Sequence, residues 1–180
     1  MAVVVALTSV AVLILVAIVT PLLLARPAFA TRFVYIVTGL VAVVLLVTAL
    51  GALLGRLDIS GEVVLPIGLP WVGLHFGIDP LSAFFLTIID LGAAIAGLYA
   101  LGYGTHEAHP ERVLPFYPAF LAGMNLVILA ADAFSFLVGW EFMSLASWAL
   151  VMAHHQIEEN RRAGFVYLVM ASFGTLMLLL

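Results

Sequence analysis

Long runs without a charged residue are the feature that most constrains this chain. Residues 2–25 carry no charge and consist almost entirely of Ala, Val, Leu and Ile. A helix needs roughly 20 apolar residues to cross a bilayer core of about 30 Å. Further predominantly apolar runs, with at most two charged residues each, occupy residues 33–55, 79–102, 113–130, 133–153 and 163–180. The pattern predicts an all-α fold, a polytopic integral membrane bundle of about six transmembrane helices.

The composition excludes the soluble classes of protein. Hydrophobic residues make up 66% of the 180-residue chain and charged residues 9%, whereas soluble domains have about 25% charged residues. A soluble enzyme, a nucleic-acid binder and a disordered regulator are all inconsistent with these values. The chain has no cysteine and no lysine, and its net charge is −4. Disulfides and cysteine-ligated metal clusters are therefore excluded.

The first apolar run has a competing interpretation as a cleaved signal peptide, with Ala28–Ala30 as a loose cleavage site. No positive residue precedes the run, and it is longer than the 7–15 residues typical of such segments. A membrane span is the favoured reading. At the other end, eighteen apolar residues close the chain without a polar flank. We therefore expect the N-terminal fragment of a longer protein.

Several local signals mark the helix ends. The longest connection is 56–78, in which residues 62–66 read as a short strand. Asp79 precedes Pro80 as a predicted N-cap, and Asp132 is the predicted N-cap of the fifth span. Only residues 131–132 separate the fourth and fifth spans, which must then form an antiparallel hairpin. Gly51 and Gly55 have a spacing that allows close helix contact.

The arginines predict the orientation. With the loops numbered alternately, five of the six arginines fall on one side of the membrane and only Arg56 falls on the other. The positive-inside rule makes the five-arginine side cytoplasmic. The N-terminus and the 56–78 loop are then expected outside, in a bacterial or archaeal cytoplasmic membrane.

Two carboxylates lie deep in the predicted spans, where an ionisable group is costly and commonly functional. Glu141 is the ninth residue of the fifth span, about 12 Å from its start at 1.5 Å per residue. It is the favoured proton-relay residue, and a structural carboxyl is the alternative. Asp90, eleven residues into the third span, is a possible secondary relay, although a packing role is favoured for it.

Two neutral residues are predicted to support these acids. Asn125, inside the fourth span, is expected to make an interhelical hydrogen bond. Ser144 lies one turn from Glu141, where it would order water or simply pack. His154 and His155 lie in the polar stretch 154–162, for which a solvated loop is favoured over a proton-collecting surface or a metal site. No catalytic, metal or cofactor site is predicted, and no cofactor is expected in this chain.

The run Gly139–Trp148 resembles the signature of the antiporter-like membrane subunits of respiratory complex I, Mrp sodium/proton antiporters and membrane-bound hydrogenases. Residues 76–82 and 120–126 resemble the starts of the third and fourth helices of that family. Residues 154–170 are most similar to the hydrogenase-4 component B and formate hydrogenlyase subunit 3 branch. The resemblance covers about residues 70–180.

The resemblance implies a fourteen-helix fold with two inverted five-helix repeats, of which this chain is a truncated part. Residues 1–130 would form N-terminal helices, and residues 131–180 would begin the proton-translocating core. Glu141 matches the family's fifth-helix glutamate, which works there with a lysine on the seventh helix. This chain has no lysine and ends before a seventh helix, so transport by the chain alone is not expected.

Three functional hypotheses follow from the residues and the resemblance together. The first is a membrane subunit of a redox-driven proton-translocating complex, of the hydrogenase-4/formate hydrogenlyase or NADH:quinone oxidoreductase type. Its partners would be other membrane subunits, the lipid bilayer and protons or sodium ions. The second is an Mrp-type cation/proton antiporter subunit. The third is a structural membrane fragment without transport activity.

Overall fold

Six long helices dominate the chain in the computed structural model, which describes all residues except 60, 69–72, 105–106, 108 and 180. The helices are α1 (Ala2–Leu23), α2 (Pro27–Leu53), α3 (Pro80–Tyr103), α4 (Phe116–Leu129), α5 (Ala133–Val151) and α6 (Glu158–Leu179). Single 3₁₀ turns precede α4 (Pro110–Arg112) and follow α5 (Met152–His154). Each of the six helices, with the 3₁₀ turns counted into α4 and α5, is long and apolar enough to cross a membrane. The chain is an all-α, multi-pass membrane bundle, as the sequence predicts.

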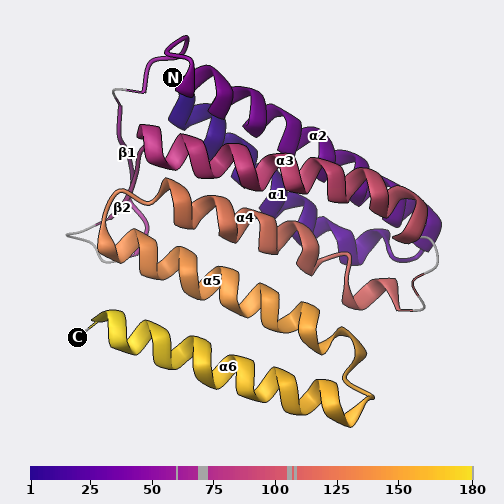
Figure 1. Cartoon of the computed structure of the whole chain (residues 1–180). Coiled ribbons are helices and arrows are strands. Elements are labelled where there is room, and N and C mark those ends of the chain that lie inside the picture. The colour runs from indigo at the N-terminus through magenta and orange to yellow at the C-terminus, as the bar shows by residue number, and fades with distance from the viewer. Residues whose placement is uncertain (60, 69–72, 105–106, 108, 180) are drawn as a thin grey trace.

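Helices α1 to α4 form a packed group, and α5 and α6 extend it as a row (Figure 1). Helix α2 packs against α1 and α3, and α4 packs against α1, α3 and α5. Helix α6 lies at the end of the row, mainly against α5. Its outward face carries exposed large side chains such as Phe165, Met170 and Phe173, which suits a lipid- or protein-facing surface.

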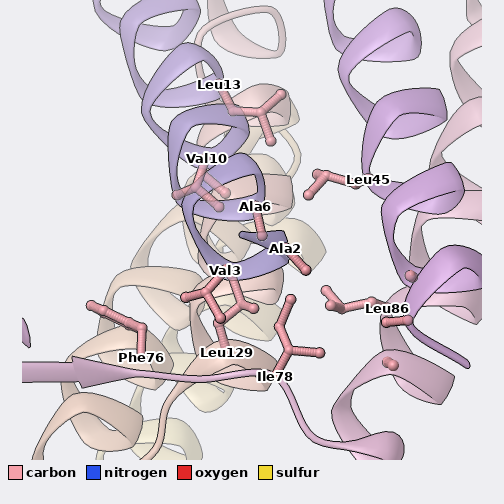
Figure 2. Packing of buried hydrophobic residues seen from close by; sticks show 14 of the residues in the cluster. Ala2, Val3, Ala6, Val10, Leu13, Leu45, Phe76, Ile78, Leu86 and Leu129 are labelled. Carbon is pink, nitrogen blue, oxygen red and sulfur yellow. The ribbon is translucent and has the colours of Figure 1, made fainter. Parts of the chain in front are cut away.

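The apolar core lies between α1, α2, α3 and α4. Figure 2 shows Ala2 and Ala6 of α1 on the side of Leu45 of α2 and Leu86 of α3, and Val3 of α1 beside Leu129. Leu129 closes the same cluster from the end of α4, beside Phe76 and Ile78. Burying side chains of this size stabilises a fold by about 1.5–3 kcal/mol each in water, and in lipid the close packing itself supplies the attraction.

A small sheet covers one end of the bundle. Strand β1 (Val63–Leu65) pairs antiparallel with β2 (Leu74–Phe76), with Val64 opposite His75. Phe76 also bridges to Ala130, where Gly77 N–H donates to Leu129 O (2.8 Å) and Ala131 N–H donates to His75 O (2.9 Å). The predicted strand is confirmed, and β2 additionally ties the 56–78 connection to the α4–α5 turn.

The predicted helix caps are confirmed. Asp79 accepts a hydrogen bond from Ser82 N–H (2.6 Å), and the Ser82 hydroxyl accepts one from Asp79 N–H (2.8 Å), which completes a capping box. Asp132 caps α5 by accepting from Ser135 N–H (2.9 Å). The α4–α5 connection comprises residues 130–132, one residue more than predicted, and the two helices form the expected antiparallel hairpin.

Two helices begin earlier than the charge pattern predicts. Helix α2 begins at Pro27 instead of residue 33, and α6 begins at Glu158 instead of residue 163. Charged residues mark the membrane boundary but do not end a helix, so Arg32, Arg161 and Arg162 all lie inside helices. Pro27 suits the first position of a helix, and Glu158 and Glu159 suit the first turn of one.

Gly51 and Gly55 end a helix instead of packing two helices together. Gly55 has φ +65°, a left-handed conformation that favours glycine, and it lies just beyond the end of α2. Arg56 N–H then donates to Gly51 O at 2.9 Å. A Cβ at Gly51 would lie 2.8 Å from Leu57 Cδ1, so the residue leaves room for the returning chain.

The two ends of the bundle carry different loops. The N-terminus, the β-sheet and the α4–α5 turn lie at one end, and the α1–α2, α3–α4 and α5–α6 connections lie at the other (Figure 1). With Asp58→Cys and Glu159→Cys made separately, we expect a membrane-impermeant thiol reagent added from outside to label only the first. The chain has no native cysteine to interfere. Labelling of position 159 alone would mean that the orientation taken from the arginines is inverted.

Candidate functional site

Glu141 lies on α5 at the interface with α6. Its Oε1 accepts a hydrogen bond from the Thr175 hydroxyl, which projects from the facing side of α6. Glu141 is half-buried, and Thr175 is only 8% exposed. Because the other charged residues of α5 and α6 all lie within the first five residues of α6, the carboxyl group and the hydroxyl group form a polar contact in a largely apolar part of both helices.

Thr175 differs from the other described threonines. Thr20, Thr31, Thr38 and Thr87 each donate to a carbonyl four residues earlier in their own helix, as does Thr48. Thr8 bonds the carbonyl of Val5. Thr175 alone among them also reaches a side chain of another helix, in addition to Ala171 O at 3.3 Å. Sequence reasoning missed this residue, although an isolated threonine in an apolar span is a known donor between helices.

Ser144, the predicted neighbour of Glu141, lies one turn further along α5 and is 3% exposed. Within the described part of the chain, the hydrogen-bond partner of the Glu141 side chain is Thr175 and not Ser144. The structure therefore places Ser144 beside the candidate site as a packed residue, and the polar contact comes from α6.

Asp90 and Asn125 meet between α3 and α4, whereas Glu141 faces Thr175 between α5 and α6. Asn125 Nδ2 lies 3.4 Å from Asp90 Oδ1 and donates at 3.0 Å to Leu121 O in its own helix. The two side chains are 1% and 0% exposed. The interhelical bond predicted for Asn125 is present, and its partner is the second buried acid.

His75, Asp132 and Ser135 form a hydrogen-bonded cluster at the end of the bundle that carries the sheet. Asp132 Oδ2 lies 3.1 Å from His75 Nδ1, and it accepts from the Ser135 hydroxyl at 2.6 Å. Backbone N–H of His75 donates to Ser135 Oγ at 2.7 Å. The serine proton goes to the carboxylate and not to the histidine, so the arrangement fastens β2 to the start of α5 and does not activate a nucleophile.

This cluster gives a testable stability effect. Burial raises the pKa of Asp132, but hydrogen bonds from the Ser135 side chain and from backbone N–H groups outweigh it, and the net pKa is lowered. A lowered folded-state pKa stabilises above the unfolded value and is lost as pH falls through the folded value. We expect Asp132→Ala to lower the thermal midpoint at neutral pH, with a difference from wild type that shrinks in acid, below about pH 4. Equal differences at both pH values would contradict the ionised cap.

The opposite end of the bundle joins two loops through polar contacts. His154 Nε2 lies 3.3 Å from Glu107 Oε1, and Arg112 donates to Ala153 O at 3.2 Å. His109 Nδ1 lies 3.1 Å from Glu111 Oε1. The described residues bring no group of three or more His, Asp or Glu side chains together in a way that could hold a metal ion. His154 and His155 lie in an exposed stretch, His154 within the 3₁₀ turn after α5 and His155 just beyond it.

A cavity of about 770 Å³ opens beside the sheet, where the start of α3 faces the α4–α5 turn. Glu62, Asp79, Phe85 and Phe136 are among its lining residues. The Asp79 carboxylate is already used by the cap of α3, and Glu141 does not line this space. The cavity is therefore separate from the candidate relay.

Comparison with known proteins agrees with the resemblance seen in the sequence. An uncharacterized protein of Mycobacterium tuberculosis is 38% identical over 133 residues, which cover 72% of this chain and 21% of that protein. Hydrogenase-4 component B of Escherichia coli is 33% identical over 109 residues, 59% of this chain and 16% of the relative. NADH-quinone oxidoreductase subunit N of Granulibacter bethesdensis is 31% identical over 133 residues, 72% of this chain and 27% of the relative.

No protein-family profile matches the chain. The chain spans between 16% and 27% of the length of these three relatives. The similarity and the six apolar helices together agree with the antiporter-like resemblance. The chain is a multi-pass membrane protein distantly related to subunits of hydrogenase-4 and NADH-quinone oxidoreductase.

Proposed function

We propose that this chain belongs to a proton-translocating subunit of a redox-driven membrane complex, of the hydrogenase-4/formate hydrogenlyase or NADH:quinone oxidoreductase type, and that Glu141 carries the proton. Its partners are then other membrane subunits of that complex in a bacterial or archaeal cytoplasmic membrane. The observation that carries the proposal is the contact between Glu141 and Thr175, a carboxyl group held by a hydroxyl group inside two membrane-spanning helices.

The chemistry of a hydroxyl group makes Thr175 a suitable partner for a carboxyl group that gains and loses a proton. A hydroxyl has one proton to donate and lone pairs to accept with. When Glu141 is ionised, Thr175 donates to it. When Glu141 is protonated, its O–H donates to Thr175 Oγ1, and the threonine proton turns to Ala171 O, which lies 3.3 Å away. Both protonation states are thus hydrogen-bonded without movement of either helix.

Transport also requires something that makes Glu141 release its proton. A carboxyl group in apolar surroundings keeps a proton, and one beside a cation releases it. The six basic residues with a permanent charge, all arginines, lie in connections or within the first six residues of a helix, and none of them is in the part of α5 or α6 that carries Glu141 and Thr175. The cation therefore comes from another helix of the complex, and its approach or withdrawal drives loading and unloading.

The proposal is tested in inverted membrane vesicles from the source organism. We expect vesicles with the intact gene to acidify on addition of the electron donor of the complex, and vesicles from a deletion strain to lose that donor-dependent acidification. Reintroducing the gene should restore it. An Mrp-type antiporter would instead show sodium-driven proton movement without an electron donor, and that outcome would overturn the redox-driven assignment.

The role of Thr175 gives a separate prediction. Thr175→Val keeps the shape of the side chain but removes the hydroxyl group, so Glu141 loses its partner in both protonation states. We expect donor-dependent proton translocation to fall by about 10-fold, corresponding to about 1.4 kcal/mol from one lost hydrogen bond. Thr87→Val is the matched control, because Thr87 bonds only its own helix. Equal rates for the two variants would remove Thr175 from the site.

A further inference from the structure

Asp90 and Asn125 each have one buried oxygen with no hydrogen-bond partner among the described residues. These atoms are Asp90 Oδ2 and Asn125 Oδ1. The other half of each group is used, because Asn125 Nδ2 donates to Leu121 O and lies 3.4 Å from Asp90 Oδ1. Buried polar atoms are normally satisfied, and each exception calls for an explanation. Here the two exceptions belong to two side chains that already touch.

A single proton bound to Asp90 would give both of these oxygens a hydrogen-bond partner. An ionised carboxylate only accepts hydrogen bonds, whereas a protonated carboxyl group also donates one. A proton on Asp90 Oδ2 would be donated to Asn125 Oδ1, while Asn125 Nδ2–H is donated to Asp90 Oδ1. The result is an acid–amide pair with two parallel hydrogen bonds. A water molecule could serve the same atoms only where space exists for it, and residue exposures of 1% and 0% leave the pair closed to the surface.

Among the residues that the structure describes, no basic side chain is paired with Asp90. On the two helices packed against α3, the titratable side chains are Arg32 and Tyr35 of α2 and Tyr117 of α4. The Tyr35 carbonyl lies beside Gly97 of α3, and the Tyr35 ring lies beside Gly104, just past the end of α3, and contacts the ring of Tyr117. Gly97 is seven residues from Asp90, which corresponds to about 10 Å along the helix. On α3 itself the other titratable groups are Tyr99 and Tyr103, further along in the same direction.

We propose that Asp90 and Asn125 form a proton-binding site that stays occupied, with Asp90 as a neutral carboxylic acid that clips α3 to α4. The site is closed, carries no counter-ion and has both of its free oxygens satisfied by the bound proton. It is distinct from Glu141, whose partner is a hydroxyl group on a helix at the edge of the bundle. Asp90 therefore does not relay protons.

Infrared difference spectroscopy on the protein in its native membrane complex tests the bound proton directly. The C=O stretching band of a protonated carboxyl group is separate from the bands of a carboxylate. We expect the difference between wild type and Asp90→Asn to contain that band, with the same intensity in mildly acidic and mildly alkaline buffer. Carboxylate bands in its place would overturn the proposal, as would a band that disappears in alkaline buffer. Glu141→Gln should leave the Asp90 band unchanged.

Thermal unfolding provides a second test that does not depend on transport. Asp90→Asn gives an amide–amide pair that keeps both hydrogen bonds, so its midpoint should lie within about 2 °C of wild type. The exchange Asp90→Asn with Asn125→Asp restores an acid–amide pair and should behave likewise. Asp90→Leu leaves the buried Asn125 amide without its partner on α3 and should lower the midpoint by much more than about 2 °C. An ionised Asp90 predicts instead that Asp90→Asn raises the midpoint markedly, because an unpaired buried charge is removed.

Transport separates this proposal from the role of Glu141. Asp90→Asn should keep wild-type proton translocation if Asp90 only holds its proton. A loss as large as that of Glu141→Gln would show that the Asp90 proton exchanges, and would overturn the clip while leaving the Glu141 proposal intact. Failure of Glu141→Gln to reduce transport would leave the infrared and thermal results for Asp90 unaffected.

Discussion

Glu141→Gln in the complete complex is expected to assemble normally and to lose most donor-dependent proton translocation. The glutamine keeps the shape of the side chain and still accepts the hydrogen bond from Thr175, so the α5–α6 interface should persist. It cannot bind and release a proton in the working pH range. A loss of at least 100-fold is expected, within the range of about 10²–10⁴ that positioned acid–base groups contribute. The measurement is acidification of inverted vesicles, normalised to the amount of assembled complex.

Two further variants make that result specific. Glu141→Asp keeps an ionisable group at shorter reach and should retain part of the activity. Glu159→Gln makes the same chemical change on an exposed residue in the first turn of α6, and it should translocate protons like wild type. If Glu141→Gln translocates protons like the Glu159→Gln control, Glu141 is a structural carboxyl group and the relay assignment is wrong.

Sequence reasoning recovers the features of this fold that depend on local chemistry. The caps at Asp79 and Asp132 can be predicted because a short polar side chain directly before an apolar run is typical of a helix N-cap. The six spans can be predicted because a single segment that crosses a bilayer must satisfy its backbone hydrogen bonds internally, which an apolar helix does. The same reasoning misplaces the starts of α2 and α6, since a helix can continue past the membrane surface with its charged residues in water.

The pairings between distant residues are the part that local patterns do not contain. Glu141 is marked by depth and charge, but its partner Thr175 lies 34 residues away on a helix whose rotation is set by packing. Asp90 and Asn125 are each visible as polar residues in apolar spans, and nothing in their spacing joins them across 35 residues. Strand β2 alternates Leu74, His75 and Phe76, but three residues are too short a run to predict a strand, and its position is defined by its neighbours.

Gly123 is the position where a single added methyl group should do the most damage. A Cβ built there would lie 2.7 Å from Met143 Cα, 2.8 Å from Met143 Cβ and 2.9 Å from Met143 N. These atoms belong to the backbone of α5 or to its first side-chain atom, so no rotamer change can relieve the contact. Helices α4 and α5 must then separate, and Glu141 lies two residues before the point of contact.

Gly123→Ala is therefore expected to destabilise the bundle and to impair transport together. Overpacking lowers the free energy of unfolding by about 3 kcal/mol at the upper end of its usual range. The higher helix propensity of alanine raises it by about 1 kcal/mol. The net cost of about 2 kcal/mol corresponds to a fall of about 4–8 °C in the thermal midpoint for a chain of this size.

Gly92→Ala is the matched control, because nothing lies within 4 Å of a Cβ at that exposed position of α3. It should leave the midpoint unchanged or raise it. Equal midpoints for the two variants would mean that α4 and α5 lie further apart at Gly123 than in this structure. The position of Glu141, two residues from that contact, would then differ as well.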